Sequence, residues 1–372
     1  MSDPITDSFA SAQYNKAIRH LIRDMSGPDQ ARARLASLIC GILFTMVETF
    51  QGNEGAAVMH LEVVIKLLNE ASDPASGQQQ IMAGSLEDEV TELVGHLDLE
   101  ASLIAIGRPP RLRLNKVQFM GGLGSTSKSR NLGVAEEASR DLNNIMRHIN
   151  HFIRSTADDY RYTNNEFIPI EVIYQQQCLL DMLRSWSAHY SYLWTAQPDA
   201  SEHIGLLQIH YHTATSMAQG CLYAEESIYD SHIDGFREIV RLAKSLNESS
   251  CSSSTQPGFS AEIRIVFPLF WVVKRCRDGL LRREALRQLQ NSSREGVWVP
   301  EIYSVVVQRI IEIEEEALEG SIPGSEEVLE SWRVHCVALT VNKEKRTVHM
   351  VYQRLLNGPD GEWNNEEDTM TY

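Results

Sequence analysis

The residues best suited to chemistry lie in a glycine-containing loop that reads GLGSTSKS, at Gly122–Ser129. A phosphate-binding P-loop reads GxxxxGK followed by Ser or Thr, because its backbone amides surround the phosphates and its lysine reaches the terminal ones. Gly122, Lys128 and Ser129 fall in register, but Ser127 replaces the second glycine, where a Cβ usually blocks the close backbone approach. The segment 121–129 therefore indicates either a degenerate nucleotide site on a helical enzyme or, as we favour, a flexible loop that could be phosphorylated.

The histidines near the middle of the sequence are poorly spaced for a metal ion. On a helix, His210 and His212 point about 200° apart, and His203 and His210 lie two turns apart. No GxSxG nucleophile elbow occurs. We therefore expect no metal site, no cofactor and no enzymatic activity, with solvated or core-edge histidines at His189, His203, His210, His212 and His232.

The cysteines and the charge balance exclude further classes. Zinc ligands usually arrive in closely spaced pairs, but the six cysteines, spread from Cys40 to Cys336, include no CxxC pair. The first residues, MSDPITDSFA, lack the basic start and apolar run of a secretory signal, so we expect free, mostly buried thiols. A net charge of −16 makes direct DNA binding by this chain a poor expectation and favours basic protein partners.

Apolar residues recur at helical spacing along most of the chain. In the window Leu35–Val47, which Arg34 and Glu48 bracket, the length predicts a core helix and no membrane span. A second helix with an apolar face follows after the short break GNEG. Two helices joined in this way are predicted to form an antiparallel pair. The first face comprises Leu35, Leu38, Ile39, Ile42, Leu43, Met46 and Phe50, and the second Leu61, Val64, Ile65 and Leu68.

Further helices follow from the same periodicity. We predict them over Ser11–Asp24, Leu86–Leu103, Ala135–Ser155, Pro169–Trp194, Ile204–Tyr223 and His232–Leu246. A buried stripe on a later helix would comprise Ile302, Val305, Val306, Ile310 and Ile313. The fold class expected is all-α, an array of packed antiparallel helices with a small C-terminal β-hairpin.

The predicted hairpin turns around Asn342–Arg346, which joins two segments in which apolar and polar residues alternate. Val334, Cys336 and Ala338 would share one face, and Val348, Met350 and Tyr352 would line one face of the partner strand. We expect an N-terminal tail at residues 1–8, one helical domain over 9–355 with flexible loops near 105–133 and 247–258, and an acidic disordered tail at 356–372.

Five segments resemble one family. They are YNKAIRHL at Tyr14–Leu21, the helical pair at Cys40–Leu68, CRDGLLRREALRQL at Cys276–Leu289, REGVW at Arg294–Trp298 and EIEEEAL at Glu312–Leu318. In order and spacing they resemble the regulatory region of fungal-specific binuclear zinc-cluster transcription factors. One departure is Val64, where many relatives carry a glycine.

The resemblance implies a nuclear regulator of transcription whose α-helical region receives signals or contacts the transcription machinery. Relatives often control metabolic genes, including clustered secondary-metabolite genes. The family's cysteine cluster and basic flank precede this region, but only thirteen residues precede Tyr14. We therefore expect action through protein partners, either the transcription machinery or a full-length relative with which the chain could dimerise. The alternatives are a reading frame that begins upstream and encodes the cluster, or a scaffold without a transcriptional role.

An arginine-rich segment allows two interpretations. Its arginines could form a contact surface for an acidic partner, or they could pair at an exposed rim with carboxylates of the following helix, and we favour the pairing. The arginines are Arg275, Arg277, Arg282, Arg283 and Arg287, and the carboxylates are Glu312, Glu314, Glu315 and Glu316.

Overall fold

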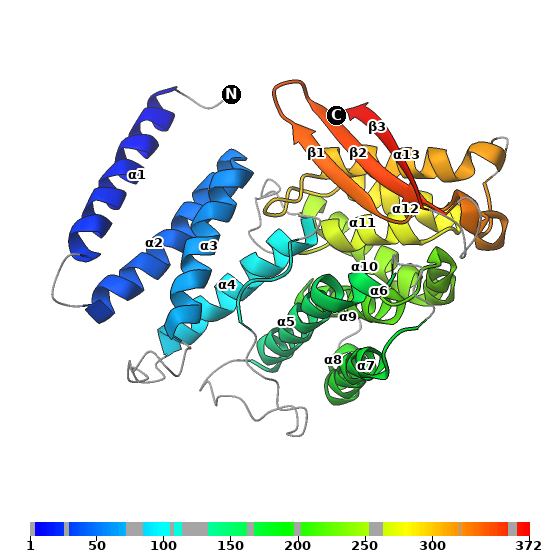
Figure 1. The fold of residues 1–372 in the computed structure, drawn as a ribbon, viewed down its shortest axis with the longest axis horizontal. Coiled ribbons are helices and arrows are strands. Elements are labelled where there is room, and N and C mark those ends of the chain that lie inside the picture. Colours follow the sequence, from blue (N-terminus) through cyan, green and yellow to red (C-terminus); the bar gives the residue numbers. More distant parts are fainter. Residues whose placement is uncertain are drawn as a thin grey trace. The chain divides into compact units, whose positions relative to one another are not determined.

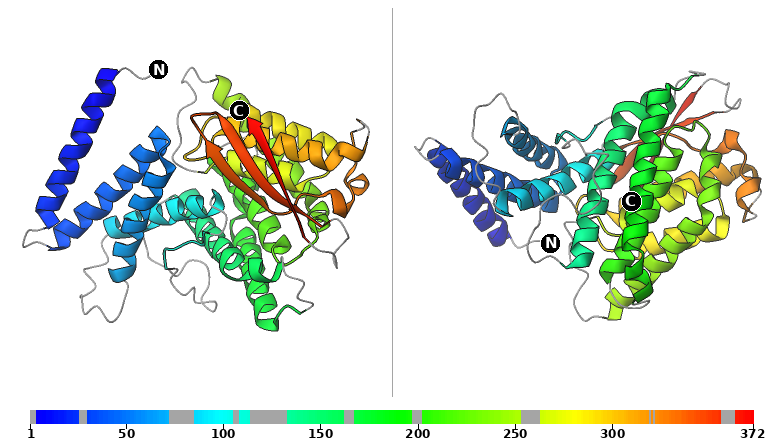
Figure 2. Two further views of the ribbon diagram at one scale, coloured as in Figure 1. Left: turned by 45° about the horizontal axis from the view of Figure 1, so that its top comes forward. Right: turned by 90° about the horizontal axis from the view of Figure 1, so that it is seen from below.

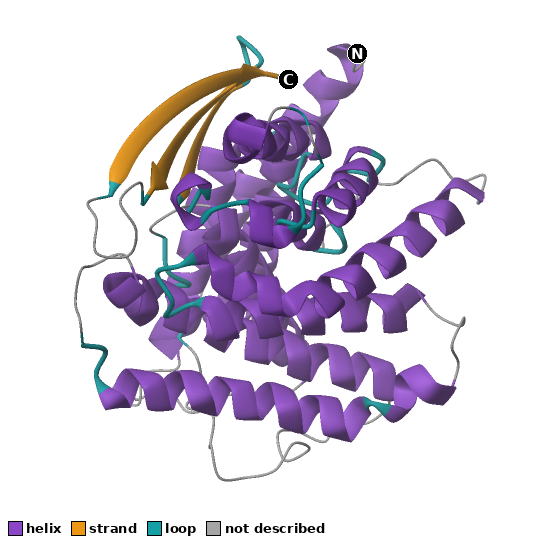
Figure 3. Cartoon of the chain, turned by 90° about the vertical axis from the view of Figure 1, so that its right-hand side faces the viewer, coloured by secondary structure: helices purple, strands orange, loops and turns teal. Residues whose placement is uncertain are grey.

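A computed structural model describes residues 4–25, 30–71, 85–104, 108–113, 133–161, 167–196, 202–252, 263–318, 320, 322–355 and 363–372. Helices dominate these residues, and the strands are confined to the C-terminal end (Figure 1, Figure 3). The expectation of an all-α fold with a small C-terminal sheet is thereby confirmed. The chain divides into two compact units, Met1–Ala101 with Arg111–Asn115 and Ser102–Pro110 with Lys116–Tyr372.

The first unit contains the predicted helical pair. Helix α2 (Gln30–Gln51) ends at Gly52, whose φ of 80° provides the left-handed turn that commonly terminates a helix. The amides of Gly52 and Asn53 donate to the carbonyls of Thr49 and Glu48, at 3.0 and 2.8 Å. Helix α3 (Glu54–Ala71) then runs back along α2, while α1 (Pro4–Met25) packs on α2 and α4 (Ser85–Ile104) follows.

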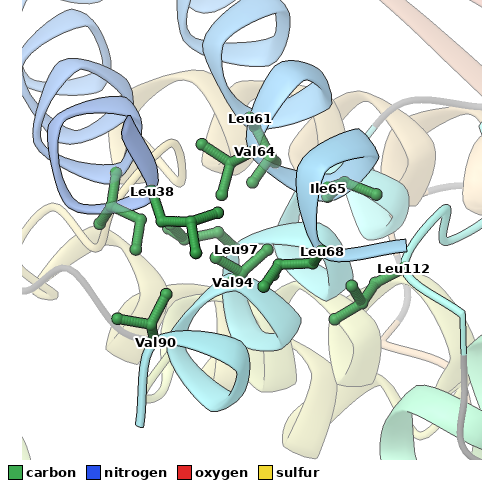
Figure 4. Packing of buried hydrophobic residues seen from close by; sticks show 10 residues of the cluster. Leu38, Leu61, Val64, Ile65, Leu68, Val90, Val94, Leu97 and Leu112 are labelled. Atoms are coloured by element: carbon green, nitrogen blue, oxygen red, sulfur yellow. The ribbon is translucent and has the colours of Figure 1, made fainter. Parts of the chain in front are cut away.

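Leucine, isoleucine and valine side chains from α2, α3 and α4, together with Leu112 from the segment 108–113, form the core of this unit (Figure 4). Val64, the departure from the family pattern, faces Gly41 on α2, where an added Cβ would overlap the Val64 side chain. The glycine that permits the close approach of α2 and α3 therefore lies on α2. The core comprises Leu38, Ile42, Leu61, Val64, Ile65, Leu68, Val90, Val94, Leu97 and Leu112.

The apolar face of α2 is wider than this core. Of the predicted face, Leu38 and Ile42 are buried, but Ile39, Leu43 and Phe50 are exposed, so only a part of this face lies in the core. Within the described residues, the stretch 32–51 of α2 also has the length and apolar composition of a membrane span. This is weak support for a membrane, because a core helix passes the same test.

The second unit is built from paired helices. Helix α5 (Val134–Phe152) continues through a π-helical segment, Ile153–Ala157, into α6 (Asp158–Arg161), and α7 (Ile170–Tyr190) leads into α8 (Tyr192–Ala196). The buried Trp186 of α7 donates from Nε1 to the carbonyl of Ala138 on α5, at 2.9 Å. The later helices are α9 (Glu202–Gly220), α10 (Ile233–Ser252), α11 (Val266–Arg275), α12 (Gly279–Gln290) and α13 (Pro300–Glu315).

The C-terminal sheet has three strands, because the end of the chain adds to the predicted hairpin. Strands β1 (Val337–Asn342), β2 (Thr347–Arg354) and β3 (Asn364–Thr371) pair antiparallel in that order, and the sheet packs on α13 (Figure 2). The expectation of a disordered tail at 356–372 was therefore wrong for β3. Acidic side chains find partners there: Glu366 bonds Tyr352 and Arg354, and Asp368 accepts from Nε of Arg309 at 2.5 Å.

The register of the sheet shows which residues of β1 lie on the same face as Val348, Met350 and Tyr352 of β2. These three side chains, predicted to line one face of their strand, are all buried. Their partners across the ladder are Val341, Leu339 and Val337, so the face that includes Ala338 is the opposite one. Residues directly opposite in an antiparallel pair share a face, which fixes the register. Val334 and Cys336 precede β1.

Two boundaries also differ from the sequence-based expectation. Helix α1 begins at Pro4, within the predicted tail 1–8, and proline is favoured in the first turn of a helix. Helix α10 continues to Ser252, within the predicted loop 247–258. Residues 108–113 and Val134 onward are described, but most of the predicted loop near 105–133 lies outside the described residues.

Candidate functional site

The second unit contains a partly open cavity of about 250 Å³. Its wall comes from the end of α4, α5 and the π-helical segment, α6, α9, the 3₁₀ turn Glu226–His232, α11, the start of α13 and the start of β1. Aromatic and aliphatic side chains make most of the wall, and charged side chains interrupt it at several points. The lining residues are Leu103, Asn150, Ile153, Arg154, Asp158, Arg161, Met217, Cys221, Tyr229, Phe267, Phe270, Trp271, Lys274, Arg275, Trp298, Tyr303, Cys336, Val337 and Leu339.

Helix α11 presents one face to this cavity. Phe267, Phe270, Trp271 and Lys274 stand at i, i+3, i+4 and i+7, which places them on one side of a helix. Trp271 is fixed by a hydrogen bond from its Nε1 to the Ser216 hydroxyl, at 2.9 Å. The helical period thus arranges three aromatic rings and one ammonium along the same wall.

The start of α11 is held by Glu295, from the REGVW segment. Its buried carboxylate accepts hydrogen bonds from the amides of Arg264, Ile265 and Val266, at 2.9 to 3.1 Å. These amides have no partner within the helix, and a negative charge there complements the helix dipole. Gly296, with a φ of 51°, makes the turn that returns the chain so that Trp298 reaches the cavity wall. The segment therefore both caps α11 and supplies part of the site.

The end of α11 is held by two arginines of the CRDGLLRREALRQL segment. Arg277 donates to the carbonyl of Arg275 and Arg282 to that of Val273, each at 2.7 Å. Both guanidinium groups also bind the Glu314 carboxylate at 2.5 Å, and none of the three side chains is exposed. Burial alone would raise the pKa of Glu314, but Arg277 and Arg282 outweigh it and lower that pKa. Opposite charges thus satisfy both ends of α11.

A second buried ion cluster lies behind the cavity wall, around Glu226. This carboxylate receives Arg161 at 2.8 Å and also pairs closely with Arg275, whose guanidinium carbon lies 4.8 Å from the ring centres of both Tyr229 and Trp271. Burial would raise the pKa of Glu226, but Arg275 and Arg161 lower it well below its usual range. These two arginines of the wall are therefore already engaged by a carboxylate.

Glu226 is positioned by its own backbone segment, the 3₁₀ turn Glu226–His232. The Glu330 carboxylate accepts from the amides of Glu226 and Ser227, at 2.7 and 2.9 Å. Arg333 binds Asp230 of the same turn through two hydrogen bonds, at 3.0 and 2.8 Å. The residues just before β1 thereby fix the turn that carries Glu226 and Tyr229.

Lys274 differs from the other cations of the cavity. It is half-buried in the wall and makes no hydrogen bond or ion pair with any residue that the structure describes. Burial, and then the charge of Arg275, lower its pKa from 10.5 to about 7. An ammonium in such surroundings is poorly solvated, so it gains from any anion that enters the cavity.

The preferred interpretation of the arginine patch agrees with this geometry, apart from the exposure that we expected. Arg277 and Arg282 bind Glu314 and Arg283 binds Glu315, but the first two are fully buried and do not lie at a rim. Arg287 is exposed and pairs with Glu284 of its own helix, while Arg275 joins Glu226. Only Arg277 and Arg282 of this patch hold the end of α11.

The other sequence-predicted groups lie elsewhere. His210 binds the carbonyl of Arg264 at 2.9 Å, and burial lowers the pKa of both His212 and His232. In the described part of the chain, no three metal-binding side chains converge. The loop 121–129 with Lys128 lies outside the described residues. Five cysteines are free thiols, namely Cys40, Cys178, Cys221, Cys276 and Cys336.

Sequence reasoning missed the cavity residues Lys274 and Arg161, and it missed Glu226 behind the cavity wall. The spacing of Phe267, Phe270, Trp271 and Lys274 could have indicated the cavity face of α11. No local pattern could have joined Arg161 to Glu226, because 65 positions separate them. Comparison of this chain with models of known families, with curated proteins and with solved structures finds no match.

Proposed function

We propose that the chain is the regulatory region of a fungal transcription regulator, which acts in the nucleus through protein contacts. The resemblance to zinc-cluster regulators supports the transcriptional part of the proposal. The all-α fold agrees with it, and the three most specific segments of the resemblance perform one shared task, since they hold both ends of α11.

The observation that carries the protein-contact part is an apolar stripe on α2. Ile39, Leu43, Val47 and Phe50 are 37, 53, 40 and 64% exposed. Their spacing of four, four and three residues places them on one side of the helix. Isolated exposed apolar residues are ordinary, but a contiguous stripe is typical of a surface that binds another protein. We therefore infer that a partner of the transcription machinery, or a full-length relative, covers this stripe with its own apolar side chains.

A tethering experiment tests this function. The full chain, fused to an unrelated DNA-binding module, should change the output of a reporter gene that carries the matching DNA element. Val47→Lys should abolish the change without lowering the thermal midpoint, because Val47 is an exposed side chain. Glu70→Gln on α3 is the matched control, since it is exposed and changes the net charge by the same amount. An unchanged reporter with the native chain would contradict the transcriptional role, and full activity of Val47→Lys would contradict the role of the stripe.

A further inference from the structure

We propose that the cavity of the second unit binds a small organic acid, whose carboxylate pairs with Lys274 and whose apolar body lies among the aromatic rings of α11 and Trp298. The binding itself stands on the geometry of the cavity. A role of that acid as an effector would rest on the proposed function, and the experiments below separate the two.

The charges of the wall favour an anion. Four cationic side chains line the cavity, Arg154, Arg161, Lys274 and Arg275, against the single carboxylate of Asp158. Arg154 is paired with Asp158 at 3.2 Å, and Arg161 and Arg275 are paired with Glu226. Lys274 is the cation of this wall that no described residue pairs, so a ligand carboxylate completes the arrangement.

The rest of the wall defines the body of the ligand. Phe270, Trp271 and Trp298 offer flat apolar surfaces, and Val337 and Leu339 extend them from β1. Sites for drug-sized ligands span roughly 300–1,000 Å³, so a cavity of about 250 Å³ suits a small metabolite. A ligand with one negative group and a compact aromatic or branched aliphatic body would therefore match both the charge and the size of the cavity.

Binding of an acid should couple to proton uptake at Lys274. Its ammonium has a pKa of about 7 in the empty cavity, and a bound carboxylate raises that pKa. At neutral pH a part of the molecules should therefore take up a proton on binding, and above the pKa of the free ammonium the affinity should fall by up to about tenfold per pH unit. The charged and titratable groups that face Lys274 are Arg275 on α11, Glu226, Arg161 and Cys336, and Arg154 and Asp158 line the same cavity.

Calorimetric titration of the full chain provides the test. Phenylacetate is the acidic probe, and phenylacetamide is its uncharged counterpart of the same shape. We expect phenylacetate to bind roughly tenfold to a hundredfold more tightly, which is the range of a charge-assisted hydrogen bond. Titrations in two buffers with different ionisation enthalpies should show proton uptake near pH 7. Equal affinities, or no binding of either probe, would overturn the proposal.

Variants locate the interaction. Lys274→Met keeps the length of the side chain and removes the charge, and should bring the affinity for phenylacetate down to that for phenylacetamide. Lys274→Arg should keep the preference for the acid but lose its pH dependence above pH 7, because arginine stays charged. Lys244→Met on the exposed surface of α10 is the control. Unfolding midpoints show that each variant is folded, and unchanged binding by Lys274→Met would contradict the assignment.

The reporter experiment gives an independent answer. If phenylacetate binds the chain but Lys274→Met leaves the output of the reporter gene unchanged, the cavity is a ligand site without a role as a regulatory input. A responsive reporter with a chain that binds neither probe would leave the proposed function standing and remove this inference.

Discussion

Arg277 and Glu314 meet at 2.5 Å in the interior of the second unit, and neither side chain is exposed. The same carboxylate accepts from Arg282 at 2.5 Å and from the amide of Val334 at 2.6 Å. One buried negative group thereby links α12 and α13, the last turn of α11 and the segment that leads into β1. A buried pair of this kind becomes costly when one partner is removed, since the other charge stays in a poorly solvating environment.

Replacing Glu314 by alanine should therefore destabilise the protein by about 3–5 kcal/mol, because two arginines lose their shared partner. Urea unfolding at neutral pH measures this change in the free energy of unfolding. Glu312→Ala is the control on the same helix, since Glu312 pairs with Arg309 at the surface and should cost at most about 1 kcal/mol. Similar decreases in the free energy of unfolding of both variants would show that Glu314 stabilises the protein no more than a surface carboxylate does.

The stability of the protein should fall in acid through Glu226. Because the folded state lowers the pKa of Glu226, its carboxylate stabilises the fold above the unfolded pKa of about 4.3, and that stabilisation is lost as the pH falls further. Glu226→Gln should be less stable at neutral pH and should lose less stability below about pH 4.3. Unfolding free energies measured across this range check both effects, with the exposed neighbour Glu225→Gln as the control. Parallel pH profiles for Glu226→Gln and the native chain would contradict the assignment.

Glu295→Ala should uncap α11. Three amides lose their acceptor, and we expect a loss of about 1–3 kcal/mol in the free energy of unfolding. Glu301→Ala, an exposed change in the first turn of α13, should cost less than about 1 kcal/mol. Faster hydrogen exchange at the first turn of α11 should accompany the Glu295 change alone, and uniform exchange in both variants would refute the capping role.

Gly41→Ala should destabilise the first unit although alanine favours helices. The added methyl overlaps Val64, and overpacking of this kind destabilises a protein by about 1–3 kcal/mol. This loss exceeds the stabilisation that the higher helix propensity of alanine provides. Gly55→Ala meets nothing within 4 Å, and should be neutral or stabilising by up to about 1 kcal/mol. The two thermal midpoints should shift in opposite directions, and a stabilised Gly41→Ala would disprove the close contact.

Local patterns in the sequence predicted much of the helical fold. The pair α2–α3 followed from periodicity and from the break at GNEG. The predicted buried stripe of α13 was confirmed at Ile302, Val306, Ile310 and Ile313, whereas Val305 is only half-buried. Such features depend on neighbours three or four residues apart, which a single sequence displays directly. The exposed part of α2 did not follow, because periodicity shows that a face is apolar but not how much of it a core can cover.

The remaining features depend on contacts between distant segments. Strand β3 is acidic and was expected to be disordered, but Glu366 and Asp368 meet arginines on β2 and α13. In the structure Glu366, Asp368 and Met370 lie on the more buried side of β3. Two of these three residues are acidic, so no alternation of apolar and polar residues marked the strand in the sequence. The convergence of Arg161, Glu226 and Arg275 has no local signal, since the fold itself brings the three together. The cavity could not be predicted from the sequence for the same reason.

Trp271 and Trp298 both line the cavity, one at the end of a hydrogen bond to Ser216 and the other packed on Phe267 and Phe270. Indole emission depends on the polarity and charge of its immediate surroundings. The chain consequently carries its own optical probes of cavity occupancy, and intrinsic fluorescence could follow the arrival of a guest in real time without an attached dye.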